Sequence, residues 1–185
     1  MTKCKMCYGE LNVQEGKGVV VCPFCGSEQT IPKMRSASAQ ELYEKAGRYR
    51  HGNEFEKAQA LYEEILNEDP TDAEAYWCVI LCKYGVEYVE DAVSHERIPT
   101  VNRTRYTSVF DDANYKAAIE NADEERKAVY EKHATIINDI QKGILEISAK
   151  ESPFDIFICY KETEPGTGER TEDSKRALNV YQTLT

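Results

Sequence analysis

Apolar residues recur at helical spacing through the middle of the chain. Between residues 39 and 70 they fall three or four positions apart in two successive segments, which predicts a pair of amphipathic helices. A third helix is expected over residues 73–82, which contain the longest apolar run of the sequence, the eight residues Ala75–Cys82. The middle of the chain is therefore predicted to be mainly α.

A further long helix is predicted from Asp111-Asp112, a good capping pair, to about Ser148. Its apolar positions alternate by four and three, which is heptad spacing. Arg126, His133 and Gly143 interrupt this pattern. We therefore favour a helix that packs on the preceding helical pair over a dimeric coiled coil.

The two ends of the chain have a different pattern. Short β-prone runs at residues 11–13 and 19–21 flank a glycine-containing segment and predict a small hairpin. The compact run at residues 154–160 predicts a buried strand, followed by a loop and a helix over residues 171–185. Strand, loop and helix form the first β-α unit of an α/β sheet.

These patterns divide the chain into four parts. We expect a small β domain over residues 1–32 and a linker over 33–38, where small and polar residues gather. A helical region follows over 39–150, and the β-α unit occupies 153–185.

The charge balance argues against nucleic acid as a partner. The 185 residues carry 23 basic and 33 acidic side chains, a net charge of −10, and only the first 35 residues are slightly basic, at +2. Such an acidic chain repels phosphate backbones. The apolar runs are too short to cross a membrane and the first residues do not form a signal peptide, so we expect a cytoplasmic protein.

The first four cysteines form a predicted metal site. Two Cys-x-x-Cys pairs are separated by 14 residues, a spacing that fits four thiolate ligands. Glycines just after each pair, Gly9 and Gly26, are expected to adopt the positive φ of such a turn. We predict one structural zinc ion, with an iron site and a redox dithiol as alternatives; the ligands are Cys4, Cys7, Cys22 and Cys25.

Two other groups of residues have alternative interpretations. Cys78 and Cys82 lie four positions apart on one helix and could share a ligand, but small core residues are the favoured interpretation. Arg97, Arg103 and Arg105 could bind an anion, although pairing with neighbouring carboxylates is favoured.

The first two regions resemble known modules. The cysteine pairs resemble those of zinc ribbons. Residues 39–70 resemble one tetratricopeptide repeat (TPR), which implies protein partners. The residues on its packing positions are Leu42, Ala46, Tyr49, Phe55, Ala58, Tyr62, Ile65 and Pro70.

The C-terminal segment resembles the start of a Toll/interleukin-1 receptor (TIR) domain. The run Phe154–Tyr160 followed by Lys161-Glu162-Thr163 is similar to the first strand and adjoining motif of bacterial TIR domains, and the order ribbon, TPR-like helices, TIR resembles a family of bacterial proteins. The resemblance implies a flavodoxin-like fold. With 32 residues after residue 153, we expect the TIR domain to be incomplete here.

This resemblance implies a role in signal transduction or immunity. Many bacterial TIR domains hydrolyse NAD+ with a downstream Glu, to which no residue here is assigned, so we expect this chain alone to be inactive. The family's nucleotide-proximal loop corresponds to Lys161, Glu162 and Arg170 as candidate cofactor-binding residues. The alternative is a non-enzymatic adaptor that acts through TIR self-association and its TPR-like region.

Overall fold

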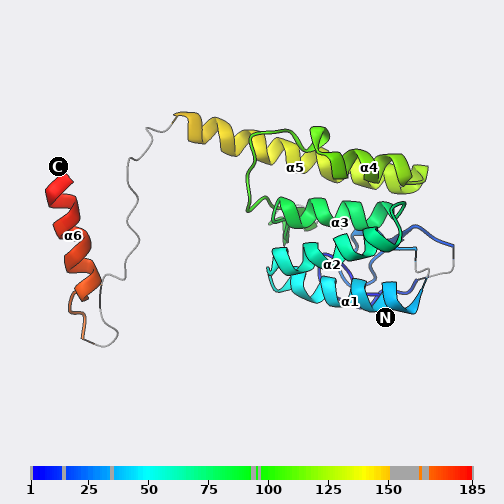
Figure 1. The fold of residues 1–185 in the computed structure, drawn as a ribbon, viewed down its shortest axis with the longest axis horizontal. Helices are drawn as coiled ribbons and strands as arrows, with labels where there is room; N and C mark the ends of the chain where they lie inside the picture. Colours follow the sequence, from blue (N-terminus) through cyan, green and yellow to red (C-terminus); the bar gives the residue numbers. More distant parts are fainter. Residues whose placement is uncertain are drawn as a thin grey trace. The chain divides into compact units, whose positions relative to one another are not determined.

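The computed structural model describes residues 2–13, 16–33, 36–92, 95, 97–150, 163 and 167–184. The chain separates into two compact units, Met1–Ser148 and Ala149–Thr185. The described part is mainly helical, with two small antiparallel sheets, and its elements are drawn in Figure 1. The expectation of a mainly α chain with a small N-terminal β structure is confirmed.

A β hairpin surrounds the second cysteine pair. Strand β1 (Val19–Val21) pairs antiparallel with β2 (Glu28–Thr30), with Val20 opposite Gln29. The predicted partner of β1, residues 11–13, is not a strand, so that prediction is wrong. The turn that forms around Cys22 reverses the chain, because the Cys22 amide donates to the Ser27 carbonyl. The hairpin thus contains two of the cysteines instead of preceding them.

The three predicted helices of the middle region are present. Helices α1 (Ala37–His51), α2 (Phe55–Glu68) and α3 (Ala73–Lys83) follow one another through short turns. The Ser36 hydroxyl caps α1 and the Asp72 carboxylate caps α3, each accepting from backbone amides of the first turn. Helix α1 therefore begins inside the segment expected to be a linker.

The predicted long helix is two helices. Helix α4 (Ala113–Asn121) ends where Ala122 has extended backbone, and α5 (Glu124–Lys150) begins after Asp123. The Asp123 carboxylate accepts the Arg126 amide and pairs with its guanidinium, which starts the new helix. Asp112 caps α4, as predicted, but the expectation of a continuous helix is wrong.

Two segments between α3 and α4 carried no sequence signal. Strand β3 (Tyr88–Glu90) pairs with β4 (Arg97–Pro99), and the 3-10 helix η1 (Val109–Asp111) precedes α4. These elements place Val86, Tyr88 and Val109 in the interior.

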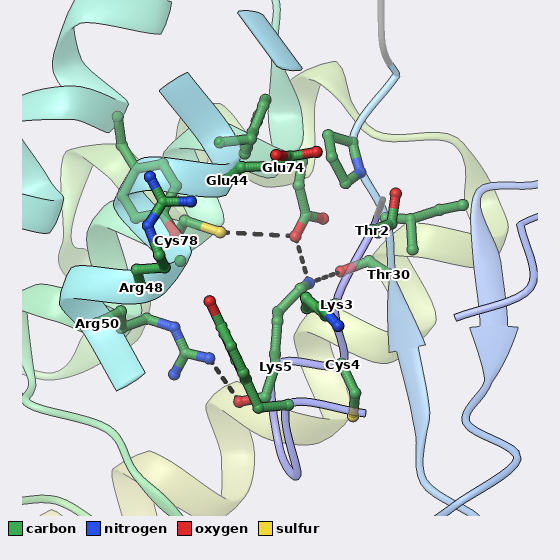
Figure 2. Close-up of a pocket in the computed structure, with 16 residues that line it drawn as sticks. Thr2, Lys3, Cys4, Lys5, Thr30, Glu44, Arg48, Arg50, Glu74 and Cys78 are labelled. Atoms are coloured by element: carbon green, nitrogen blue, oxygen red, sulfur yellow. Dashed lines mark hydrogen bonds and ion pairs between the residues drawn. The ribbon is translucent and has the colours of Figure 1, made fainter. Parts of the chain in front are cut away.

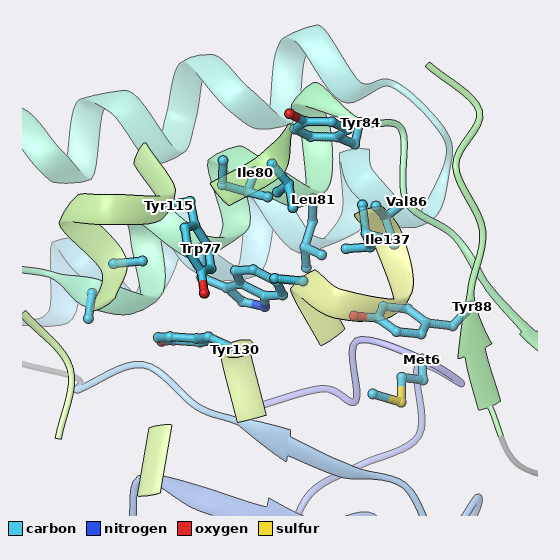
Figure 3. Packing of buried hydrophobic residues seen from close by; sticks show 14 of the residues in the cluster. Met6, Trp77, Ile80, Leu81, Tyr84, Val86, Tyr88, Tyr115, Tyr130 and Ile137 are labelled. Atoms are coloured by element: carbon cyan, nitrogen blue, oxygen red, sulfur yellow. The ribbon is translucent and has the colours of Figure 1, made fainter. Parts of the chain in front are cut away.

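Helix α3 is shared by two buried clusters. The first, here called the ribbon core, joins the cysteine region to α3, α4 and α5 (Figure 3), with Cys4, Met6, Trp77, Tyr84 and Tyr130 among its members. The second lies between α1, α2 and α3 and is here called the hairpin core, after the antiparallel helical pair α1–α2 and not the β hairpin. It includes Tyr43, Ala46, Tyr62, Cys78 and Cys82. The N-terminal cysteine region, residues 2–13 and 16–33, here called the ribbon, is therefore integrated with the helices of its unit.

Helix α5 packs on the helical region. The Tyr130 ring stacks on Trp77 of α3 with centroids 5.0 Å apart, which agrees with the favoured interpretation over a coiled coil. Arg126 and His133, which interrupt the heptad pattern, are nevertheless buried. Arg126 donates to the Ile31 carbonyl and thereby ties α5 to the ribbon.

The second unit contains helix α6 (Glu172–Leu184), close to the predicted range. Thr171 caps it by accepting the Ser174 amide. Ala177 is buried, whereas Leu178, Val180 and Tyr181 are exposed. The strand expected at residues 154–160 lies outside the described residues.

Within the described part of the chain, helices long and apolar enough to span a bilayer are absent.

Candidate metal centre

The four predicted ligands lie together. The sulfurs of Cys4, Cys7, Cys22 and Cys25 are all within 4.8 Å of one another. Cys4 Sγ is 3.8 Å from Cys25 Sγ, and Cys7 Sγ is 3.6 Å from Cys22 Sγ. A tetrahedral zinc ion with Zn–S bonds of about 2.3 Å requires sulfurs about 3.8 Å apart. The four side chains thus fit one ion bound at their centre.

Each cysteine pair forms a turn that directs amides toward a sulfur. The amides of Met6 and Cys7 point to Cys4 Sγ at 3.3 and 3.4 Å, and the Phe24 amide points to Cys22 Sγ at 3.4 Å. These donors stabilise thiolate charge, because a backbone N–H offers a partial positive charge to the sulfur.

The glycines after the two pairs have different roles. Gly26 has a φ of +69°, as predicted. After the first pair the left-handed residue is Tyr8, with a φ of 62°, so the prediction for Gly9 is wrong. A β-carbon at Gly9 would lie 2.6 Å from the Phe24 ring, so this glycine allows the exposed Phe24 side chain to lie against the first turn.

The electrostatics of the cluster favour a bound cation. Burial raises the pKa of the Cys7 thiol to about 12. At Cys25 burial also raises the pKa, but hydrogen bonds with Ser27 outweigh it and lower the pKa to about 7. Four thiolates this close repel one another, and a divalent ion compensates that repulsion. The donor set therefore suits a metal better than four free thiols.

The coordination sphere of such an ion would be closed. Four sulfurs complete a tetrahedron and leave no position for a catalytic water, which is the arrangement of structural sites. A tetrahedral four-sulfur set is compatible with zinc and with iron. The cluster is thus a candidate structural centre rather than a catalytic one.

A buried polar network connects this centre to α3. The side-chain amide of Gln29 donates from Nε2 to Cys4 Sγ at 2.9 Å, and its Oε1 accepts the backbone N–H of Lys5 at 2.8 Å. The Lys5 ammonium pairs with Glu74 on α3 and donates to Thr30 (Figure 2). Glu74 also accepts the Tyr130 hydroxyl at 2.9 Å. The first cysteine turn, α3 and α5 are therefore joined by charged and polar contacts.

Sequence reasoning missed Gln29, Lys5 and Glu74. The one available signal was Glu74, an acidic residue at the start of an otherwise apolar helix. An acidic residue is also common in the first turn of a helix. The sequence therefore did not distinguish a buried partner of Lys5 from an ordinary helix-start residue.

The remaining candidate residues are mostly structural. Cys78 and Cys82 are buried in the hairpin core, as favoured. Arg97 pairs with Glu90 and Arg103 with Glu56, as favoured, while Arg105 donates to the Lys83 carbonyl.

Of the three candidate cofactor-binding residues, Arg170 lies in the described part of the chain. Lys161 and Glu162 lie outside the described residues. Arg170 is exposed and forms an isolated antiparallel bridge with Thr163.

Comparisons with known proteins found no match to a family model, to a curated protein or to a solved structure.

Proposed function

We propose that the first unit is a zinc-stabilised scaffold that presents a TIR-type signalling segment. The cluster of four cysteine sulfurs within 4.8 Å carries the zinc part of this proposal. Through the network from Cys4 by way of Gln29 and Lys5 to Glu74, the metal would stabilise the position of the helices as well as the fold of the ribbon.

Elemental analysis of purified protein tests the metal assignment. We expect one zinc per chain in the wild type and none in Cys22→Ser, because a three-sulfur set leaves the tetrahedron open. Cys82→Ser is the matched control, since its thiol is equally buried but lies in the hairpin core, and it should retain zinc. One equivalent of iron, or full zinc in Cys22→Ser, would contradict the assignment.

The signalling part of the proposal rests on the resemblance of residues 153–185 to TIR domains. In a protein with a complete TIR domain, we propose that this domain hydrolyses NAD+ and that the TPR-like helices recruit a protein partner. Lys161, Glu162 and Arg170 are the candidates in this chain for contact with the nucleotide.

Nicotinamide release tests this activity. The 185-residue chain and a chimera that keeps residues 1–185 and continues into the remaining part of a bacterial TIR domain are incubated separately with NAD+. We expect release by the chimera alone, because a single β-α unit lacks the neighbouring strands that form a pocket. Turnover by the 185-residue chain would contradict this expectation.

A non-enzymatic adaptor is the second candidate. Exposed apolar residues on α6, namely Leu178, Val180 and Tyr181, favour it, because exposed apolar side chains on a short helix suit contact with another protein. Self-association that is lost in Tyr181→Ser, without nicotinamide release by the chimera, would favour the adaptor.

A further inference from the structure

A cavity of about 200 Å³ lies where the first cysteine turn meets the helices. The cavity is lined by residues of the N-terminal segment, of the end of β2 and of each of the helices α1, α2 and α3 (Figure 2). Its wall includes the rings of Tyr8, Tyr43 and Tyr62 as well as several charged side chains. The cavity is distinct from the metal centre, although Cys4 contributes to its edge.

The charged lining is mainly basic. Lys3, Lys5, Arg48 and Arg50 contribute positive charge, against Glu44 and Glu74. Lys5 is paired with Glu74 and Lys3 with Glu10, which leaves Arg48 and Arg50 against Glu44. An excess of positive charge in a cavity is unexpected in a chain with a net charge of −10.

Arg50 is a buried charge for which the described residues supply no counter-ion. Its side chain is 6% exposed, and its guanidinium donates to the carbonyls of Lys5 and Val86. In the part of the chain that the structure describes, no carboxylate lies within 4.0 Å of it. The two carbonyls satisfy hydrogen bonds but supply no negative charge, and a buried ion is normally paired.

The sulfurs of the cysteine cluster do not serve as a counter-ion for Arg50, because its guanidinium does not contact them in the described residues. The donors to these sulfurs are backbone amides and Gln29, and the Arg50 guanidinium is not among them in the described residues. A guanidinium has five N–H donors in a planar fork, so donors remain for a further acceptor.

Gly47 provides an independent observation. It lies in the interior of α1 and lines the same cavity, and among the described residues no atom beyond its chain neighbours and the adjoining helix backbone is within 4 Å of the position that its β-carbon would take. Glycine is unfavourable inside a helix, and here neither close packing nor a positive φ requires it. A side chain added at position 47 would therefore extend toward this cavity without first displacing a neighbour.

We propose that the cavity binds a small organic anion whose carboxylate or phosphate group pairs with Arg50 and whose apolar body lies against Tyr43 and Tyr62. An empty cavity of about 150 Å³ accommodates benzene, so this volume suits a ligand of about ten non-hydrogen atoms. The planar guanidinium matches the two oxygens of either anionic group, and the tyrosine rings supply apolar surface.

Calorimetric titration of the zinc-loaded 185-residue chain tests the proposal. The probes are benzoate, phenyl phosphate and benzamide, in a buffer free of phosphate and carboxylates. We expect saturable binding of benzoate or phenyl phosphate at one site, and the stronger of the two identifies the anionic group. Benzamide has the shape of benzoate without its charge and should bind at least about tenfold more weakly.

Two leucine variants locate the site. Gly47→Leu should abolish binding, because its side chain fills the cavity while Arg50 remains. Gly143→Leu is the matched control: it also lies in a helix with no atom within 4 Å of its β-carbon position, but outside this cavity, and should bind as the wild type does. Zinc content and circular dichroism confirm that both variants are folded.

Arg50→Gln should lose the preference for benzoate over benzamide. If that variant fails to fold, the proposal is tested by the comparison of benzoate with benzamide in the wild type and by Gly47→Leu, because both experiments use protein that keeps Arg50. The proposal is overturned by the absence of saturable binding for both anions, by equal affinity for benzamide, or by unchanged binding in Gly47→Leu.

Discussion

The hairpin core and the ribbon core lie on different sides of α3 and are built in different ways. The hairpin core joins residues between Tyr43 and Cys82, and its rings Tyr43 and Tyr62 meet with centroids 5.8 Å apart. The ribbon core joins Cys4 to residues as distant as Ile137 and includes two of the four clustered cysteines. One core forms between neighbouring helices, while the other joins distant segments to the turns of the cysteine cluster.

This difference has a physical consequence. Contacts between neighbouring helices cost little loop-closure entropy, whereas contacts across more than 100 residues require stronger anchors. The ribbon is also too small to bury much apolar surface by itself. We therefore expect the ribbon core to depend on the metal and the hairpin core to be less sensitive to it.

Removal of the metal should have the largest effect. Structural zinc contributes on the order of 10 kcal/mol to folding of small sites, which is as large as the stability of a whole domain. After chelation, we expect amide hydrogen exchange to lose protection in β1, β2 and α5 before α1 and α2. Simultaneous loss in all of them would show that the two cores unfold together.

Truncation of one aromatic residue in each core should cost about 3–5 kcal/mol. Trp77 and Tyr62 are 1% and 3% exposed and represent the ribbon core and the hairpin core. Denaturant melts of Trp77→Ala and Tyr62→Ala measure this cost with and without chelator. We expect the cost of Trp77→Ala to vanish after chelation and that of Tyr62→Ala to persist. The opposite pattern would reverse our assignment of metal dependence.

Acidification should weaken the ribbon core through His133. Burial, together with the charges of Lys5 and Lys132, lowers the pKa of this side chain to about 4, and its Nδ1 lies 3.1 Å from the Tyr88 hydroxyl. The unfolded chain takes up this proton near pH 6.5, before the folded chain does, so stability is present above that pH and is lost as the pH falls toward 4. The loss should reach at most about 3 kcal/mol.

The measurement is the difference in unfolding free energy between the wild type and His133→Gln from pH 7.5 to 4.5. This difference separates His133 from the pH dependence of the cysteines, because both proteins keep the cluster. A difference that does not change with pH would show that His133 has an ordinary pKa.

Gly47→Ala should have the smallest effect and the opposite sign. Alanine is favoured over glycine in a helix by about 0.5–1 kcal/mol, and the space around Gly47 is open. We expect a modest gain in α1 stability in thermal melts, matched by Gly143→Ala in α5. A loss in Gly47→Ala alone would indicate that the residue is needed for packing of the hairpin core.

The sequence by itself determined the local features of this protein. Helix periodicity predicted α1, α2 and α3, because this signal acts within one or two helical turns. The spacing of the cysteine pairs predicted the four-sulfur cluster, because the chemistry of the metal fixes its ligands.

Only the tertiary structure decided how these parts join. The pairing of β1 with β2 depends on the turn around Cys22. At the break between α4 and α5, Asp123 accepts the Arg126 amide, and the Arg126 guanidinium donates to the Ile31 carbonyl. Lys5, Glu74 and Arg50 are ordinary charged residues in the sequence. They become a buried network and a basic cavity because distant segments exclude water from them, and short-range patterns carry no information on such contacts.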